Sequence, residues 1–449
     1  MAEIRKVSKK DIETLVRLLR EQSEVGLEME SLRVTPEGFL AHTPHPFPDE
    51  PQFDRDFCEN QVEIITPVCY SAEEACRTLC EYSSEVRRRL LALPTGPELL
   101  WPFSNPPYCR GEEDVPIAQF TGEAAEKTEY RNYLSEKYGR RLMLLSGIHY
   151  NYSYPPEALD MFAEICGKYT PERGEDPAEF RRMTAETAYL MLAEKAAFYS
   201  WLIVALTAAS PVSDGSFWED APPGTPGKEG LSSVRCSEYG YWNRFVPTFS
   251  YESADAYIAS VMRYIGSGYL QSPRELYYPI RLKPRGAYDV QKLREGIGHI
   301  EFRMLDLNPF AGGALALEDL EFLHLLIAWM TLMPRQRLNR RQQEEAVANM
   351  KAAAHYPLEE VRIDLPFGDE SVRVPLAEAA LGVLDSMEEI LGEDPAIGFQ
   401  REKILHPEKR YAERIRRICG TNGEDYIAAG LRLAAEAAEG SETNVQEDR

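Results

Sequence analysis

Acidic side chains recur at every second position in one short stretch near the start of the chain. Glu28 and Glu30 alternate there with Leu27 and Met29. Because successive side chains of a β-strand point to opposite faces, this spacing predicts a strand with one acidic face. Three further stretches, 59–66, 146–154 and 300–306, alternate in the same way, and their polar positions are Glu59, Gln61, Glu63, His149, Asn151, Ser153, Glu301 and Arg303.

These polar positions have the composition of a cation site. A single amphipathic strand usually turns its polar side to water, and that alternative holds for each stretch taken alone. Lysine, however, is absent from all four stretches. If the strands pair in one sheet, the carboxylates repel one another unless divalent cations neutralise them. Oxygen ligands with one imidazole suit Mg²⁺ or Mn²⁺ better than Zn²⁺, and a nearby arginine adds the means to bind ATP phosphates.

The elements around these strands are expected to be mainly helical. Ser8 and Ser71 each precede an acidic residue by three positions, which predicts two capped helix starts. Apolar runs predict helices over 184–209 and 318–332, and the chain from about residue 342 reads as mostly helical. The Pro/Gly-rich segment 218–230 is either a flap over a site or a surface loop. Strands mixed with helices indicate an α+β fold.

Composition and motifs exclude several other functions. The chain of 449 residues has a net charge of −23, which disfavours nucleic-acid and anionic-membrane partners. Its longest apolar run, 196–209, is too short for a membrane span. Eight dispersed cysteines without a paired spacing indicate reduced thiols and a cytoplasmic protein. Phosphate-loop, dinucleotide, serine-hydrolase and zinc-protease motifs are absent, so the alternating strands are the main chemical signal.

The same stretches resemble glutamate–cysteine ligase of the bacterial type, especially the ligase half of the bifunctional glutathione synthases. The matching segments follow the family's order through most of residues 25–330, and they include GLEMESLRV, DFCENQVEIITPV, EYRNYLSEKYG, SGIHYNYSYP, GYWN, LYYPIR and IEFRMLDLNPF. The resemblance implies an antiparallel sheet of six strands curled into a funnel, like that of glutamine synthetase, with helices packed outside. It also implies ATP-dependent formation of γ-glutamylcysteine from L-glutamate and L-cysteine, the first step of glutathione biosynthesis.

The resemblance also assigns roles to individual residues. Arg303, Glu301 and Glu63 are the implied catalytic residues, and Arg303, Glu28 and Asn151 the implied nucleotide-binding ones. The implied ligands of Mg²⁺ or Mn²⁺ are Glu28, Glu30, Asp56, Glu63, His149 and Glu301. The implied substrate-binding residues are Phe57, Tyr130, Arg131, Arg235 and Tyr241, with Arg235 and Tyr241 close in sequence to the 218–230 segment. Many relatives carry a basic residue where this chain has Met29, and we expect that difference to alter packing and not chemistry.

Domain organisation and partners complete the expectations. Residues 1–340 are expected to form the catalytic domain and residues 341–449 a mostly helical portion packed on it, without the glycine-adding ATP-grasp domain. A separate glutathione synthetase would then act downstream of a monomeric enzyme. Two alternatives stay open: a γ-glutamyl ligase that uses a different amine, and a non-catalytic metal-binding regulator.

Overall fold

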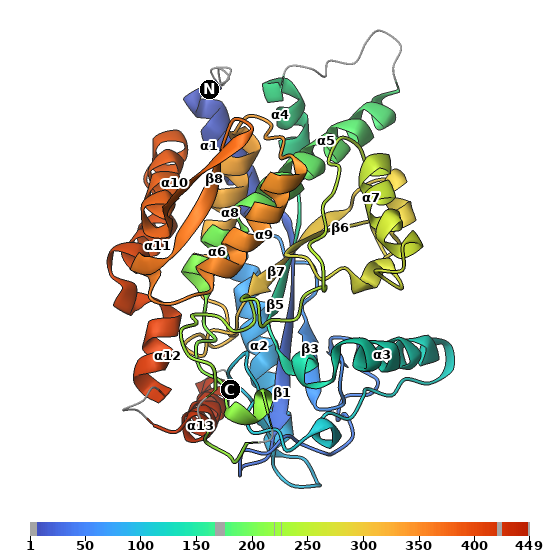
Figure 1. Ribbon diagram of the computed structural model, residues 1–449, viewed down its shortest axis with the longest axis vertical. Helices are drawn as coiled ribbons and strands as arrows, with labels where there is room; N and C mark the ends of the chain where they lie inside the picture. The colour runs from blue at the N-terminus through green and yellow to red at the C-terminus, as the bar shows by residue number, and fades with distance from the viewer. Residues whose placement is uncertain (1–6, 167–175, 220, 226, 420–423, 448–449) are drawn as a thin grey trace.

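An antiparallel sheet runs through the centre of the molecule (Figure 1). The computed structural model describes residues 7–166, 176–219, 221–225, 227–419 and 424–447. Six strands follow one another in the order β2-β3-β1-β5-β7-β6, and a seventh, β4, pairs with the end of β1. Their bounds are β1 Glu24–Val34, β2 Phe53–Arg55, β3 Gln61–Ile65, β4 Leu99–Leu100, β5 Ile148–Ser153, β6 Ile280–Lys283 and β7 His299–Leu305. The four strands predicted from alternation are therefore confirmed, and the fold is α+β.

The register of the sheet brings the predicted polar positions side by side. Glu28 lies opposite His149 across β1 and β5, and Glu30 lies opposite Glu63 across β1 and β3. Asn151 is the partner of Glu301 across β5 and β7. Since paired residues in an antiparallel sheet point to the same face, these side chains share one surface.

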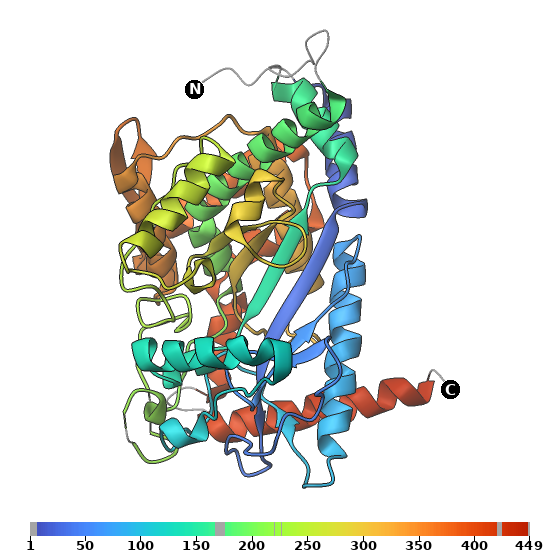
Figure 2. The same ribbon diagram turned by 90° about the vertical axis from the view of Figure 1, so that its right-hand side faces the viewer.

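The opposite face of the sheet is apolar and covered by helices. Leu27, Tyr150 and Phe302 are fully buried in the main core. Helices α2, α5 and α6 pack on the strands, α8 packs on α2 and α5, and α1 packs on α8 (Figures 1 and 2). Their bounds are α1 Lys9–Glu21, α2 Ala72–Leu91, α5 Pro177–Phe198, α6 Ser200–Thr207 and α8 Leu317–Leu332. The Ser8 and Ser71 side chains accept backbone hydrogen bonds from Asp11 and Glu74, which confirms both predicted helix starts.

The single helix predicted over 184–209 is wrong, because the segment bends by 55° between α5 and α6. Tyr199 leaves the helical conformation with a ψ of 6°. The Ser200 hydroxyl donates to the Ala197 carbonyl at 2.8 Å, a local bond that competes with regular helix hydrogen bonding. Of the chain that the structure describes, no single helix is long and apolar enough to cross a membrane, and α5 with α6 meets that criterion only if the bend is ignored.

The remaining α-helices of the described chain surround this central unit (Figure 1). They are α3 Ala125–Tyr138, α4 Pro156–Cys166, α7 Ala254–Gly266, α9 Arg340–Ala353, α10 Leu376–Leu391, α11 Pro395–Leu405, α12 Tyr411–Cys419 and α13 Tyr426–Glu447.

The portion after residue 342 is not helical throughout. It contains a hairpin, β8 Arg362–Phe367 with β9 Glu370–Pro375, whose two-residue turn places Gly368 at a φ of 62°. Glycine adopts that left-handed conformation at little cost, and Gly-Asp is a typical pair for a two-residue hairpin turn.

Candidate active site

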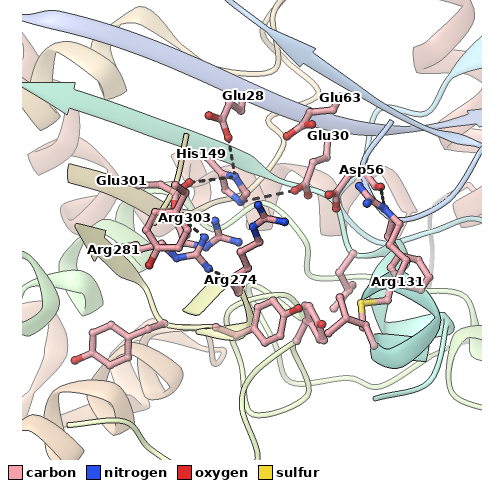
Figure 3. Close-up of a pocket in the computed structure, with 18 of the residues that line it drawn as sticks. Glu28, Glu30, Asp56, Glu63, Arg131, His149, Arg274, Arg281, Glu301 and Arg303 are labelled. Atoms are coloured by element: carbon pink, nitrogen blue, oxygen red, sulfur yellow. Dashed lines mark hydrogen bonds and ion pairs between the residues drawn. The ribbon is translucent and has the colours of Figure 1, made fainter. Parts of the chain in front are cut away.

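A cavity of about 470 Å³ opens on the polar face of the sheet (Figure 3). Every site residue predicted from the sequence lines it except Asn151, whose amide instead donates to Glu28 Oε1 at 3.0 Å. Strands β1, β3, β5, β6 and β7 supply its charged end. Helix α3 and the segments around residues 241 and 277 supply an aromatic end. The cavity thus joins two chemically different surfaces.

Glu28, His149 and Glu301 form a compact group at the charged end. One ligand atom from each lies within 4.8 Å of the others. His149 Nδ1 is 3.4 Å from Glu28 Oε2 and 4.0 Å from Glu301 Oε1. Burial and the positive charge of Arg303 lower the pKa of His149 to about 4. The imidazole is therefore neutral near pH 7, which is the state in which it binds a metal ion.

Glu301 is fully buried and is surrounded by cations. Its carboxylate lies 2.9 Å from Arg303, 2.6 Å from Lys283 and 3.5 Å from Arg281. Burial alone raises the pKa of a carboxyl group, but these charges hold the pKa of Glu301 well below its ordinary value. The Glu301 charge in turn raises the pKa of Arg303 against the effect of burial. Both groups are ionised at neutral pH.

A second acidic group lies on the other side of His149 (Figure 3). It consists of Glu30, Asp56 and Glu63, which line the cavity outside the compact group. Burial and the charge of Asp56 raise the pKa of Glu30 to about 8. Burial and the same neighbour raise the pKa of Glu63 well above its ordinary value. These carboxyl groups lack enough positive charge nearby to stabilise their ionised forms.

This donor set fits divalent cations. Glu30 and Glu63 repel neighbouring carboxylates, and a bound cation would remove that repulsion. The buried Asn151 Oδ1 is an acceptor oxygen that has no hydrogen-bond partner among the described residues. Several oxygens with one imidazole nitrogen match Mg²⁺ or Mn²⁺. All six predicted ligands line this cavity, and among the described residues Glu28, His149 and Glu301 lie close enough together to hold one ion.

The aromatic end contains the residues predicted to bind the amine substrate. Phe57, Tyr130, Arg131 and Tyr241 all line it. The Tyr241 ring lies 3.9 Å from the Tyr277 ring, centroid to centroid, and burial raises the pKa of Tyr130 to about 12. Arg131 donates from Nε to the Asp56 carbonyl, which ties α3 to the acidic end. These phenols stay neutral, and this surface binds by contact and hydrogen bonding.

Arg235 occupies the boundary between the two ends. Its guanidinium donates to the carbonyls of Arg303 at 2.7 Å and Leu305 at 3.3 Å. A Cβ at Gly147 would lie 2.2 Å from Arg235 Cζ, so only glycine leaves room for the guanidinium there. Its charge faces the acidic end of the cavity, where it partly offsets the rise in the pKa of Glu30.

Sequence reasoning missed several cavity residues, among them Tyr277, Arg281 and Lys283, which follow one another closely in the chain. Arg281 and Lys283 alternate with Ile280 and Leu282 along β6, so period-two alternation was the signal that identifies them. Tyr277 precedes that strand and has no comparable pattern. Conversely, no described residue of the 218–230 segment lines the cavity. Gly224 of that segment donates to Asp214 Oδ2 at 2.9 Å, away from the site.

Comparison with known proteins identifies the family. The model of the family described as glutamate-cysteine ligase matches residues 10–269 and 262–353. The chain belongs to the glutamate–cysteine ligase family. It is 35% identical over 412 residues to the glutathione biosynthesis bifunctional protein GshAB of Listeria monocytogenes, covering 87% of this chain and 51% of that protein. The corresponding protein of Clostridium perfringens is 33% identical over 437 residues, covering 92% and 54%.

Two solved structures share the fold. The bifunctional glutathione synthetase of Pasteurella multocida matches with a TM-score of 0.78 and 28% identity, covering 97% of this chain and 55% of that one. The glutamate–cysteine ligase of Francisella tularensis, solved in complex with AMP, matches with a TM-score of 0.79 and 22% identity, covering 94% and 89%. The chain spans about half the length of the curated relatives that it matches.

Proposed function

We propose that the protein joins the γ-carboxylate of L-glutamate to the amine of L-cysteine at the expense of ATP. The product is γ-glutamylcysteine, and the reaction is the first step of glutathione synthesis. The observation that carries this proposal is the single cavity in which a carboxylate face with Arg303 meets an aromatic wall. Family membership supports the same reaction, and ATP is the phosphoryl donor.

The charged end would activate glutamate. A carboxylate is a poor electrophile, so a γ-carboxylate oxygen first attacks the γ-phosphorus of ATP and displaces ADP. Arg303 is suited to hold the transferring phosphoryl group, because its charge faces the cavity beside Glu301. The residues that would hold Mg²⁺ or Mn²⁺ are Glu28, Glu30, Asp56, Glu63, His149 and Glu301. The cation, when bound, supplies charge neutralisation between glutamate and the triphosphate.

The aromatic end would hold the acceptor. The cysteine amine attacks the acyl carbon of γ-glutamyl phosphate, the bond to phosphate breaks, and the amine gives up a proton. A carboxylate that lines the cavity, such as Glu63, is a candidate to accept that proton. Tyr130 and Tyr241 offer contact to a polarizable thiol, and Arg235 offers a charge to a substrate carboxylate. This arrangement keeps the nucleophile beside the activated carbonyl.

We also propose a shape for the sheet and a division of the chain into two parts. We take the sheet to be the funnel type found in glutamine synthetase, with residues 1–340 forming the catalytic unit and residues 341–449 packed on it. Support comes from the polar face of the strands, which lies on the cavity side, and from α13, which packs on α2. In this view the protein acts as a cytoplasmic monomer.

The first assay tests which amine serves as the acceptor. Phosphate release is measured with ATP, Mg²⁺ and L-glutamate, and with cysteine, 2-aminobutyrate, alanine or a small alkylamine as the acceptor. Rates that require glutamate and are highest with cysteine are expected. A preference for an amine without a thiol contradicts the cysteine assignment, and no glutamate-dependent phosphate release contradicts a ligase of any kind.

A further inference from the structure

We propose that Glu275 is a positioning residue for the acceptor end of the cavity, where it anchors helix α3 to the segment that carries Tyr277. The inference rests on the proposed function and adds a residue that does not itself line the cavity. Glu275 ends a short 3₁₀ turn, Pro273–Glu275, and its side chain is fully buried. A buried carboxylate is costly unless it is paired and hydrogen-bonded, so its partners indicate what it holds together.

Nearly all of the partners of Glu275 come from one helix. Tyr138 donates its hydroxyl to Oε1 at 2.7 Å, and Tyr133 donates to Oε2 at 3.0 Å. Lys137 forms an ion pair with Oε1 and also donates to the Tyr133 hydroxyl at 2.9 Å. The fourth donor is the backbone N–H of Gln271, at 2.6 Å, within the same segment as Glu275. Three side chains of α3 thus converge on one carboxylate.

The same helix presents its other side to the cavity. Tyr130, Arg131 and Leu134 of α3 line the cavity, whereas Tyr133, Lys137 and Tyr138 reach Glu275. Helix α3 lies at the periphery of the molecule (Figure 1), and its buried apolar surface is small, with Leu134 as its one fully buried residue among those described. The ion pair and hydrogen bonds to Glu275 therefore provide much of what fixes the helix in place.

A second chain of contacts leads from Glu275 to the rest of the aromatic wall. Asn243 donates to the Glu275 carbonyl at 2.8 Å and accepts from the Tyr277 backbone N–H at 2.9 Å. The Tyr138 ring packs edge-on against Tyr241 and Tyr277, with centroids 5.3 and 5.7 Å away. Replacement of Glu275 by glutamine would remove the charge that pairs with Lys137 and one of the two oxygens that accept from the Tyr133 and Tyr138 hydroxyls. The wall would then loosen on both sides of the acceptor, whereas the strands that carry the charged end would keep their register.

The test compares Glu275→Gln with Glu136→Gln, which removes the same charge from an exposed position of α3. Steady-state rates are measured as phosphate and as γ-glutamylcysteine while ATP, glutamate or cysteine is varied. For Glu275→Gln we expect the KM for cysteine to rise about tenfold, the KM for ATP to stay within about twofold, and the preference for cysteine over 2-aminobutyrate to fall. The Glu136→Gln variant is expected to match the wild type.

Tyr138→Phe supplies a second variant, which keeps the ring and removes only the hydroxyl that donates to Glu275. We expect a smaller rise in the KM for cysteine, about threefold. If Glu275→Gln fails to fold, this variant tests the positioning role of Glu275. An unchanged cysteine KM in every variant that folds, or equal losses toward ATP and cysteine, would overturn the positioning role. A wild-type protein without glutamate-dependent phosphate release overturns the proposed function instead, so the two failures are distinguishable.

Discussion

The two ends of the cavity are built in different ways. The charged end comes from neighbouring strands, where hydrogen-bonded register sets which side chains meet, as for Glu28 with His149. The aromatic end comes from α3 and from irregular segments, where side-chain networks such as that of Glu275 set the geometry. Chemistry that must neutralise and align phosphates needs the more rigid frame. In the proposed function, the acceptor is recognised by the end that side-chain networks hold together.

This contrast predicts that substitutions at the two ends of the cavity impair different steps. Changes on the strands should reduce turnover, because they remove charge where we propose that phosphoryl transfer takes place. Changes on the aromatic wall should affect cysteine binding and leave ATP binding almost unchanged. Variants at each end therefore test whether the ends act independently.

The largest effect is expected on the charged end. Glu28→Gln, Glu63→Gln and Glu301→Gln should each reduce kcat by about two orders of magnitude or more, because each removes the charge of a proposed metal ligand beside the proposed phosphate site. Without metal, Glu63→Gln should be at least as resistant to heat as the wild type, since carboxylate repulsion is relieved.

Glu24→Gln is the matched control, because Glu24 lies on the same strand and pairs at 3.6 Å with the exposed Arg285 away from the cavity. Its kcat should equal that of the wild type. Loss of folding in the three cavity variants, with full activity in whatever folded protein remains, contradicts a catalytic role for this face.

The aromatic end should show a smaller and more selective effect. Tyr241→Ala removes a ring that packs against Tyr138 and Tyr277, and we expect the KM for cysteine to rise about tenfold, the equivalent of about 1.4 kcal/mol. The KM for ATP should hardly change. Initial rates with each substrate varied in turn provide the measurement, and Tyr239→Ala, at a partly exposed position near in sequence, is the control. A loss of ATP affinity as large as that for cysteine contradicts the separation of the two ends.

A substitution of Lys283 tests which charges neutralise Glu301 when no metal is bound. Its ammonium lies 2.6 Å from Glu301, so it competes with a cation for that carboxylate. Lys283→Met should bind Mn²⁺ about three- to tenfold more tightly in the absence of ATP, as measured by calorimetric titration. Lys292→Met, at an exposed position, should leave the affinity unchanged. Weaker Mn²⁺ binding in Lys283→Met places the cation elsewhere.

The last prediction concerns the apolar face of the sheet, away from both ends of the cavity. His324 on α8 is buried against Tyr150 and Tyr152, and neither ring nitrogen has a hydrogen-bond partner among the described residues. Burial and the charge of Arg20 lower its pKa to about 3, whereas the unfolded chain binds that proton near pH 6.5. The unfolded state therefore binds more protons between these values, and stability falls as the pH drops below 6.5.

His324→Phe should remove this contribution. Between pH 7 and pH 5 the wild type should lose about 2 kcal/mol of unfolding free energy more than the variant loses. Denaturant unfolding at both pH values measures the difference. Equal losses in the two proteins show that His324 is not the responsible group.

The charged end was largely predictable from the sequence because strand geometry is local. Alternation around Glu28, Glu63, His149 and Glu301 identified one polar face, and the observed register joins these positions. The cations of β6 were missed, although Arg281 and Lys283 alternate in the same way, because that strand is only four residues long. The family resemblance was needed to connect the face with its chemistry.

Other features depend on contacts between distant segments, which alternation does not reveal. Glu275 meets Tyr133 and Tyr138 only because α3 folds back on the 271–277 segment. The bend at Tyr199 interrupts an apolar run that reads as continuous helix, because a Ser200 hydroxyl bond and tertiary packing override propensity. The β8–β9 hairpin was missed although the Gly368-Asp369 pair between two short stretches is typical of one.

The central claim is that the charged end activates the γ-carboxylate of glutamate by phosphorylation before the amine from the aromatic end attacks. Its most direct test uses L-glutamate labelled with ¹⁸O in the γ-carboxylate, together with ATP, Mg²⁺ and cysteine, and mass spectrometry of the phosphate released. The proposed route predicts that each phosphate formed with γ-glutamylcysteine carries one ¹⁸O atom from glutamate. Phosphate without ¹⁸O in the presence of γ-glutamylcysteine would contradict it.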